Sequence, residues 1–306
     1  MPVAYLPSPS SAVWHLGALP VRAYALCMVA GVAVALWLTD RWYRRAGGQP
    51  GTILNLATLA VPAGLIGARI FSVLTDFHRY FGPGRDWVDS LRVWEGGMGV
   101  AGAVAAGALA AWAYCRRTGI DIGPVALAAA PALAVGQAIS VWGNWFSQTL
   151  YGSPSGLLWA VAIAPVHRVA GYQATATFQP LFVYQSAADL LIAIAVSYLS
   201  RRYLLTGDRA FALYAALWAA SATAIETMRI DYSARFYGLR SNVIAMVAIL
   251  VLAVGYLIVL ARRQRQRALM VQEPPARHRM LRPRSSQAAA GQLGLGGTRQ
   301  PGDPPA

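Results

Sequence analysis

The chain has 306 residues, of which 57% are hydrophobic and only 12% are charged, with a formal net charge of +14. Because soluble domains usually carry about a quarter charged residues, this composition argues against a soluble globular protein and predicts an integral membrane protein. Two cysteines and four scattered histidines give neither a disulfide framework nor a metal-binding cluster, so no metal is expected.

Seven apolar stretches, each long enough to cross a bilayer, predict an all-α integral membrane protein with seven transmembrane helices. A Pro- and Ser-rich lead-in, residues 1–19, comes first and lacks the basic start of a signal peptide. The transmembrane domain covers residues 20–261, and residues 262–306 form a basic tail with too few apolar residues to fold. The predicted helices lie near residues 20–39, 54–75, 97–115, 123–146, 180–199, 209–228 and 242–261.

Arginine is unevenly distributed between the two sides of these predicted helices. All 26 basic residues are arginine; the tail and the loops on its side hold 17, and the opposite loops hold seven. The positive-inside rule therefore places the N-terminus outside and the C-terminus in the cytoplasm. We expect the tail to attract anionic lipid headgroups and to form no nucleic-acid site.

Several polar side chains lie at membrane depth and toward the outer side of the predicted helices. Ionisable groups inside a bilayer are costly, so they usually mark a functional site; the alternative is an internal ion pair, such as Glu226 with Arg69, that only ties helices together. Arginine is well suited to a phosphate because its donors form a fork. The residues concerned are Tyr24, Arg69, Asn144, Gln148, Glu226 and Arg229.

The motifs around these residues resemble those of bacterial phosphatidylglycerol–prolipoprotein diacylglyceryl transferases. The resemblance covers about residues 5–262. It rests on "LPSPSSAVWHLGALPVRAYAL", the "GAR" that ends at Arg69, "WEGG", "WGNWFSQTLYG", "HRVAGY" and "IETMRIDYSARFYGLRSN".

This resemblance implies a seven-helix enzyme of the bacterial plasma membrane with its N-terminus outside. The implied reaction moves the diacylglyceryl group of phosphatidylglycerol to the lipobox cysteine thiol of a prolipoprotein, so the implied partners are phosphatidylglycerol and prolipoprotein signal peptides. No cofactor is expected. The implied catalytic residues are Tyr24, Arg69, Glu226 and Arg229, and the implied substrate-binding residues are Asn144, Gln148, Gly152 and Arg240.

The chain also departs from the family pattern at charged positions. The family's arginines are replaced by Val141 and Ala222, a glutamate by Thr149, and a frequent histidine by Ala101. Three hypotheses follow: a working transferase, a catalytically lapsed paralogue that binds phospholipid or signal segments without transfer, and a transporter. The transporter has no support from sequence repeats or paired broken helices.

Overall fold

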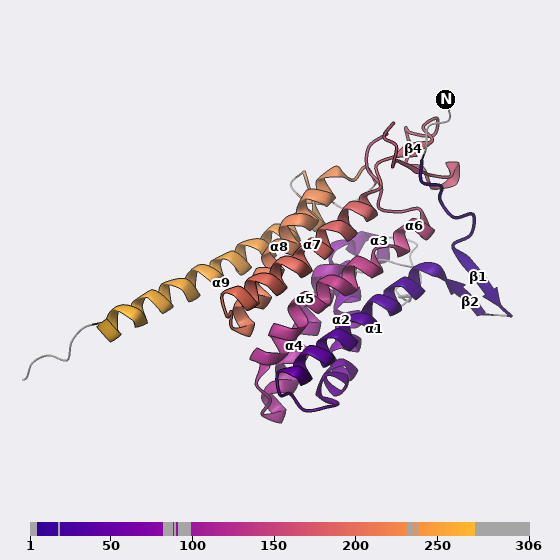
Figure 1. Cartoon of the computed structure of the whole chain (residues 1–306). Helices are drawn as coiled ribbons and strands as arrows, with labels where there is room; N and C mark the ends of the chain where they lie inside the picture. The colour runs from indigo at the N-terminus through magenta and orange to yellow at the C-terminus, as the bar shows by residue number, and fades with distance from the viewer. Residues whose placement is uncertain are drawn as a thin grey trace, which may run out of the picture. The chain divides into compact units, whose positions relative to one another are not determined.

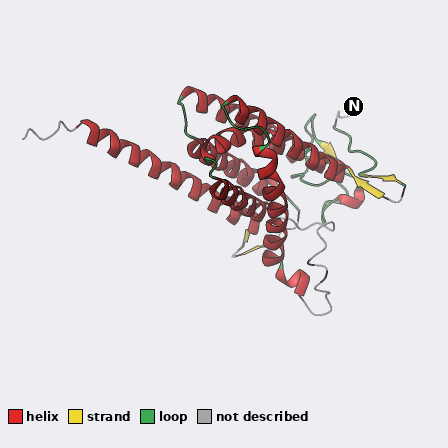
Figure 2. Ribbon diagram, turned by 90° about the horizontal axis from the view of Figure 1, so that it is seen from below, coloured by secondary structure: helices red, strands yellow, loops and turns green. Residues whose placement is uncertain are grey.

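Helices dominate the described part of the chain, and its strands form short two-stranded pairs (Figure 2). The structure, a computed structural model, describes residues 5–17, 19–81, 88, 90, 99–231, 235–236 and 238–272. Seven of the described helices have 19 or more residues, and one lies in each of the seven predicted stretches. The long helices are α1 (Ala23–Arg45), α2 (Thr52–Thr75), α4 (Val100–Thr118), α5 (Ile122–Ser140), α7 (Leu181–Arg202), α8 (Gly207–Met228) and α9 (Ser241–Gln272).

Short elements connect these helices. Three two-stranded antiparallel sheets pair β1 with β2, β3 with β4, and β5 with β6. The short helices are α3 (Phe77–Phe81), α6 (Gly143–Ser147) and the 3₁₀ turn Pro165–His167. The strands are β1 (Val13–Leu16), β2 (Leu19–Arg22), β3 (Val161–Ala162), β4 (Thr177–Phe178), β5 (Arg235–Phe236) and β6 (Leu239–Arg240).

Several predicted helix boundaries differ from those of the structure, and two of them show why. The first helix begins at Ala23 rather than near residue 20, because residues 19–22 form strand β2 and pair with β1. The stretch 123–146 is interrupted at residues 141–142, between α5 and α6. Both differences arise from pairing and packing with distant segments, which hydropathy does not report.

Five of the described helices are long and apolar enough to cross a membrane by length and composition. Of the seven predicted spans, α4 and α8 do not meet that criterion: α4 is built largely of alanine and ends in an arginine pair, and α8 carries Glu226. The five spans are Ala23–Arg45, Thr52–Thr75, Ile122–Ser147, Leu181–Arg202 and Ser241–Gln266.

Glycines allow two pairs of long helices to approach closely. Gly31 of α1 faces Gly136 of α5, and Gly67 of α2 faces Gly102 of α4; a Cβ on any of these glycines would collide with its partner's backbone. Small residues are the usual means of helix contact in a bilayer, where lipid is as apolar as the side chains. Because Gly67 lies two residues before Arg69, this contact also fixes where Arg69 leaves α2.

Apolar side chains pack in separate clusters along the helices. One cluster joins α5, α7, α8 and α9 around Ala134, Val196, Trp218 and Met246; we call it the bundle core. A second, around Tyr151, Val161, Ile163, Phe178 and Phe182, lies beyond the end of α5; we call it the cap cluster.

The cap cluster and the N-terminal segment occupy the same end of the helices as α6. Leu6 bridges to Val161 of β3, and the nitrogen of Leu6 donates to the carbonyl of Ala160 at 2.8 Å. Figure 1 shows the β1–β2 hairpin, α6 and β4 near that end. The segments before α1, after α5 and before α7 therefore meet at this end.

The chain divides into two units, Met1–Arg263 and Gln264–Ala306. In the second unit the structure describes only the end of α9, which continues to Gln272, past the expected end at residue 261. The rest of the predicted tail lies outside the described residues.

Candidate active site

Four charged side chains form a closed ion-pair network where α8 ends. Glu226 receives Arg229 Nη1 on Oε2 at 3.2 Å and Arg240 Nε on Oε1 at 2.8 Å. Asp231 receives Arg229 Nε at 2.9 Å and Arg240 Nη2 at 3.0 Å, both on Oδ1, and Arg229 Nη2 on Oδ2. Asn242 adds a donor to Glu226 at 3.3 Å. We call Glu226, Arg229, Asp231 and Arg240 the charged cluster.

The local chain path brings Arg240 back to Glu226. Helix α8 ends at Met228, and Arg229 already has an extended backbone at ψ 140°. Strands β5 and β6 then form a hairpin, whose turn holds Gly238 at φ +81°, a conformation that favours glycine. The nitrogen Nη1 of Arg240 also donates to the carbonyl of Asp231 at 3.0 Å. A turn of the chain, rather than one helix face, thus assembles the cluster.

The charges of the cluster cancel. Burial alone would raise the pKa of the Asp231 carboxyl, but Arg229 and Arg240 outweigh it and hold that pKa below its ordinary value of 3.8. Burial likewise disfavours the charged form of Arg229, but Asp231 and Glu226 outweigh it and raise the pKa of this guanidinium. Asp231 and Arg229 are therefore charged near neutral pH, and the cluster as a whole has two acidic and two basic members.

We expect Asp231→Asn to make the stability of the folded protein depend less steeply on pH in acid solution. Because the folded-state pKa of Asp231 lies below 3.8, its charge contributes stability above about pH 4, and this is lost as the pH falls through the folded-state value. Thermal unfolding in detergent between neutral and strongly acid pH checks this. The wild type should lose stability more steeply than Asp231→Asn below about pH 4; parallel profiles would contradict the assignment.

Tyr24 and Gly152, both expected at the site, lie beside the charged cluster. Tyr24 packs against Gly143 of α6, since a Cβ on that glycine would lie 3.1 Å from the Tyr24 Cα, and its hydroxyl is within electrostatic range of Arg229. A Cβ on Gly152 would lie 3.1 Å from the carbonyl oxygen of Met228, the residue before Arg229. The starts of α1 and α6, the loop at Gly152 and the end of α8 therefore converge.

Asn144 is held within its own segment. Its Nδ2 donates to the carbonyl of Val141 at 2.8 Å, and its Oδ1 accepts from the hydroxyl of Thr149 at 2.9 Å. A carboxylate at position 149 could not donate to Asn144 in this way. Thr149, where the family pattern has glutamate, therefore fixes the orientation of the Asn144 amide.

Gln148 follows the end of α6, whereas Asn144 lies within this short helix. Its backbone leaves α6 in the left-handed region at φ 53°. Its buried amide donates to the carbonyl of Pro9 at 3.3 Å and accepts from the nitrogen of Ala164 at 2.7 Å. Gln148 thus joins the N-terminal segment to the cap cluster, and its proposed role in substrate binding remains a prediction.

Arg69 contacts a different part of the protein. Its Nε donates to the carbonyl of Ser90 at 2.7 Å, and its guanidinium lies 4.9 Å from the ring centre of Tyr80. Glu226 pairs with Arg229 and Arg240 rather than with Arg69, so the structure does not support the alternative of a Glu226–Arg69 pair. Among the described residues, Arg69 is near α3 rather than in the charged cluster.

Apolar packing surrounds the positions where the family pattern has a further arginine or histidine. Val141 packs against the cap cluster, and both Ala101 of α4 and Ala222 of α8 pack against the bundle core. Ala222 lies one turn before Glu226, so it shares that helix face. Small apolar side chains therefore continue the packed surfaces at these three positions.

Tyr151 supports the loop that carries Gly152. Its buried hydroxyl donates to the carbonyl of His167 at 2.6 Å and accepts from the nitrogen of Val169 at 3.0 Å. Burial is the main cause that raises the pKa of this phenol, so it remains a donor. The hydroxyl thus satisfies two backbone groups of the 165–169 segment.

We expect Tyr151→Phe to lower the free energy of unfolding by about 1–3 kcal/mol, because both backbone groups lose their partner in a buried site. Tyr172→Phe is the matched control: Tyr172 packs on the same cluster, and within the described residues its hydroxyl has no hydrogen bond. Unfolding by SDS in mixed micelles measures both variants. Equal losses would show that ring packing, not the hydroxyl, matters.

Two members of the site, Asp231 and Asn242, were not predicted. The sequence does carry a signal for Asp231, which follows Arg229 by two residues in "IETMRID". No local pattern indicates Asn242, because its contact with Glu226 depends on the hairpin between them.

The fold and the site define the class: a helical protein with several candidate membrane spans and a neutral cluster of paired charges beside the end of α8. The family model for prolipoprotein diacylglyceryl transferase matches residues 11–260. The chain belongs to this family.

Individual relatives agree with this assignment. The phosphatidylglycerol–prolipoprotein diacylglyceryl transferase of Streptomyces griseus subsp. griseus is 44% identical over 263 residues, which cover 86% of this chain and 79% of that protein. The one of Corynebacterium efficiens is 41% identical over 315 residues, covering 100% of this chain and 97% of that protein. The one of Cutibacterium acnes is 42% identical over 258 residues, covering 84% and 87%.

Proposed function

We propose that this protein transfers the diacylglyceryl group of phosphatidylglycerol to the cysteine thiol of a prolipoprotein. The sulfur forms a bond to the glyceryl carbon, the carbon–oxygen bond to the phosphate breaks, and glycerol-1-phosphate leaves; the thiol loses its proton before attack. The relatives named above carry this activity in their names. The nucleophile belongs to the substrate, so the reaction requires no catalytic cysteine of the enzyme.

The observation that carries the proposal is how Arg229 holds Asp231. Its Nε and Nη2 contact the two carboxylate oxygens of Asp231, which is the fork arrangement that arginine also uses for phosphate. Asp231 is the most exposed member of the cluster, at 35%, against 9% for Glu226. We infer that the lipid phosphate replaces Asp231 on Arg229, while Glu226 and Arg240 keep the fork in place.

The proposed roles of the other residues follow from their positions. Tyr24 borders the cluster on the α1 side, and Gly152 keeps the loop close to Met228 without a side chain in the way. Asn144 is oriented by Thr149, and Arg69, Arg240 and Gln148 are included because the family motifs imply them. Fixed donors of this kind act on charge that develops on the leaving phosphate.

We further propose seven spans with the N-terminus outside and the C-terminus in the cytoplasm of a bacterial plasma membrane. Arginine pairs occupy the last turns of α1, α4 and α7, the ends that this topology assigns to the cytoplasm. The charged cluster would then be at the extracytoplasmic end. Labelling of single cysteines introduced next to Arg45 and next to Gly152, from outside intact cells, tests this orientation.

Complementation in cells tests the transfer. A bacterium depleted of its own transferase should regain growth and modified lipoproteins when it expresses this chain at a membrane level matched to a relative such as the Corynebacterium efficiens protein. The proposal is contradicted if the chain is present in the membrane and restores neither growth nor modified lipoproteins.

A second candidate function is binding of phospholipid or signal segments without transfer. It is favoured by the apolar packing at Val141, Ala101 and Ala222, where the family pattern has charged or titratable side chains. Retention of a lipobox peptide by a chain that fails in complementation would support this second function.

A further inference from the structure

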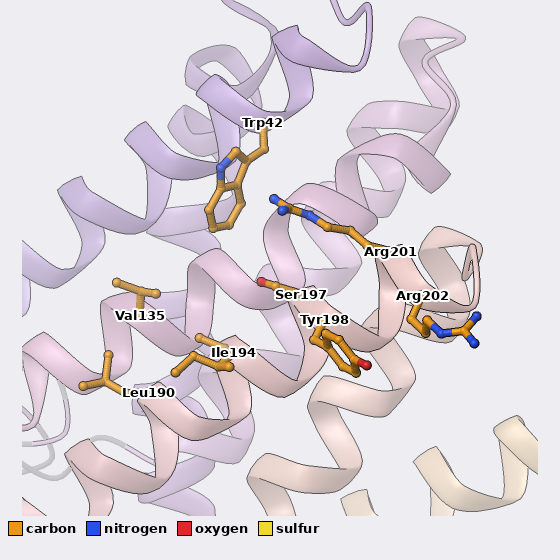
Figure 3. Close-up of a pocket in the computed structure, with 9 residues that line it drawn as sticks. Trp42, Val135, Leu190, Ile194, Ser197, Tyr198, Arg201 and Arg202 are labelled. Carbon is orange, nitrogen blue, oxygen red and sulfur yellow. The ribbon is translucent and has the colours of Figure 1, made fainter.

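A groove of about 730 Å³ lies at the C-terminal end of α7, where this helix carries Arg201 and Arg202. The charged cluster lies at the opposite end of the helices. Trp42 of α1 and Val135 of α5 line it together with residues of α7 (Figure 3). Helix α5 packs against both α1 and α7, so Val135 belongs to the floor between two helical walls.

The α7 side of the groove is a single helical face. Its lining residues recur at three- and four-residue intervals, which places them on one side of the helix. Leu190, Ile194 and Tyr198 are exposed by 46%, 65% and 64%, so no helix that the structure describes covers this face. The α7 residues concerned are Leu190, Ala193, Ile194, Ser197, Tyr198, Arg201 and Arg202.

The length of this face matches one leaflet of a bilayer. From Leu190 to Arg201 the helix rises roughly 16 Å, and half of a bilayer's hydrocarbon core is about 15 Å thick. If α7 spans the membrane, the apolar part of the groove lies at acyl-chain depth and the two arginines lie at headgroup depth. Trp42 and Tyr198 have the amphipathic rings typical of that boundary.

The polar end of the groove has unused hydrogen-bonding and charge capacity. Within the described part of the chain, neither Arg201 nor Arg202 forms an ion pair, and neither Trp42 Nε1 nor the Ser197 hydroxyl has a hydrogen-bond partner. In Figure 3 the Arg201 guanidinium is turned toward the Trp42 side, whereas Arg202 points to the other side, where it stacks on Tyr203 at 5.7 Å. Arg44, by contrast, is paired with Asp40 at 3.2 Å.

We propose that this groove is a binding site for one anionic phospholipid of the leaflet in which α1 and α7 end. One acyl chain lies along Leu190, Ile194 and Val135, and Arg201 holds the phosphate, with Ser197 and Trp42 as further donors. This lipid is not a substrate of the charged cluster, which lies at the opposite end of the helices. The proposal therefore does not depend on the transfer reaction.

Lipid retention measured by native mass spectrometry tests the site. The full chain is reconstituted with phosphatidylserine and phosphatidylcholine, so that phosphatidylglycerol does not occupy the candidate active site, and is then released from nanodiscs. We expect one retained phosphatidylserine on the wild type. Its retention should fall about 30-fold in Arg201→Gln/Arg202→Gln, as two basic charges near anionic lipid predict.

Two further variants make the test specific. Arg116→Gln/Arg117→Gln removes the arginine pair from the end of α4, outside the groove, and should retain phosphatidylserine as the wild type does. Ile194→Trp fills the exposed groove without changing charge and should also lose the lipid. Circular dichroism and gel-filtration elution identify any variant that misfolds.

The proposal is overturned if Arg201→Gln/Arg202→Gln retains phosphatidylserine as the wild type does, or if the α4 pair variant loses it equally. It is also overturned if Ile194→Trp has no effect, since the acyl chain would then lie elsewhere. Transfer activity should be unchanged in Arg201→Gln/Arg202→Gln, which separates this site from the candidate active site.

Discussion

Glu226→Ala is expected to lower the free energy of unfolding by about 3–5 kcal/mol, the usual loss when one partner of a buried ion pair is removed. The side chain of Glu226 is 9% exposed and that of Arg240 is 12% exposed. Among the described residues, Arg240 would then keep Asp231 and backbone carbonyls as its partners. Unfolding by SDS in mixed micelles measures this loss.

Two matched variants separate charge from shape. Glu226→Gln keeps the acceptor oxygen and should lose less stability than Glu226→Ala, while Thr227→Ala, an exposed change in the same turn, should have almost no effect. A loss below about 1 kcal/mol for Glu226→Ala would be typical of an exposed surface pair. It would contradict a network that organises this end of the protein.

Val141→Arg/Ala222→Arg is expected to raise kcat/KM of transfer by about 10²-fold or more, because a single preorganised donor to developing charge is typically worth 10²–10³ in rate. The charged cluster has no surplus positive charge, since Arg229 and Arg240 are matched by Glu226 and Asp231. An arginine at position 222 would lie four residues before Glu226 and could pair with it. That ion pair would compete with Arg229 for Glu226 and leave an N–H donor of Arg229 available for the lipid phosphate.

Ala224→Arg is the control for this double variant. It adds the same charge to α8 on its exposed face, two residues further along the helix, and should leave the rate unchanged. Initial rates with a lipobox peptide over a range of phosphatidylglycerol contents give kcat/KM. If the double variant is no faster than Ala224→Arg, the missing arginines are not what limits transfer.

The helices were predictable because each one depends on a local run of apolar residues, whereas their ends depend on distant partners. Residues 19–22 pair with β1 instead of starting α1. The end of the fourth stretch is set by contacts such as that of Gln148 with Pro9, which lies 139 positions away. A sequence pattern within one window carries no record of such contacts.

The members of the site were likewise predictable where local spacing brings them together, and not where distant segments do. Glu226 and Arg229 are three residues apart, so the sequence predicted that they lie close together, although Arg229 follows the end of α8 with an extended backbone. Arg240 joins them only because the β5–β6 hairpin turns the chain back, and Asp231 and Asn242 follow the same path. Conversely, Arg69 and Gln148 looked equivalent to these residues in sequence, but their described contacts lie with Tyr80 and Ser90 and with Pro9 and Ala164.

The central claim is that the chain itself transfers a diacylglyceryl group. The most direct measurement uses the purified chain in phosphatidylglycerol nanodiscs with a lipobox peptide, and mass spectrometry of the peptide and of released glycerol phosphate. A peptide with serine in place of the lipobox cysteine and a known transferase are run beside it. We predict a diacylglyceryl adduct on the cysteine peptide together with glycerol phosphate; neither product, with the known transferase active, would contradict the account.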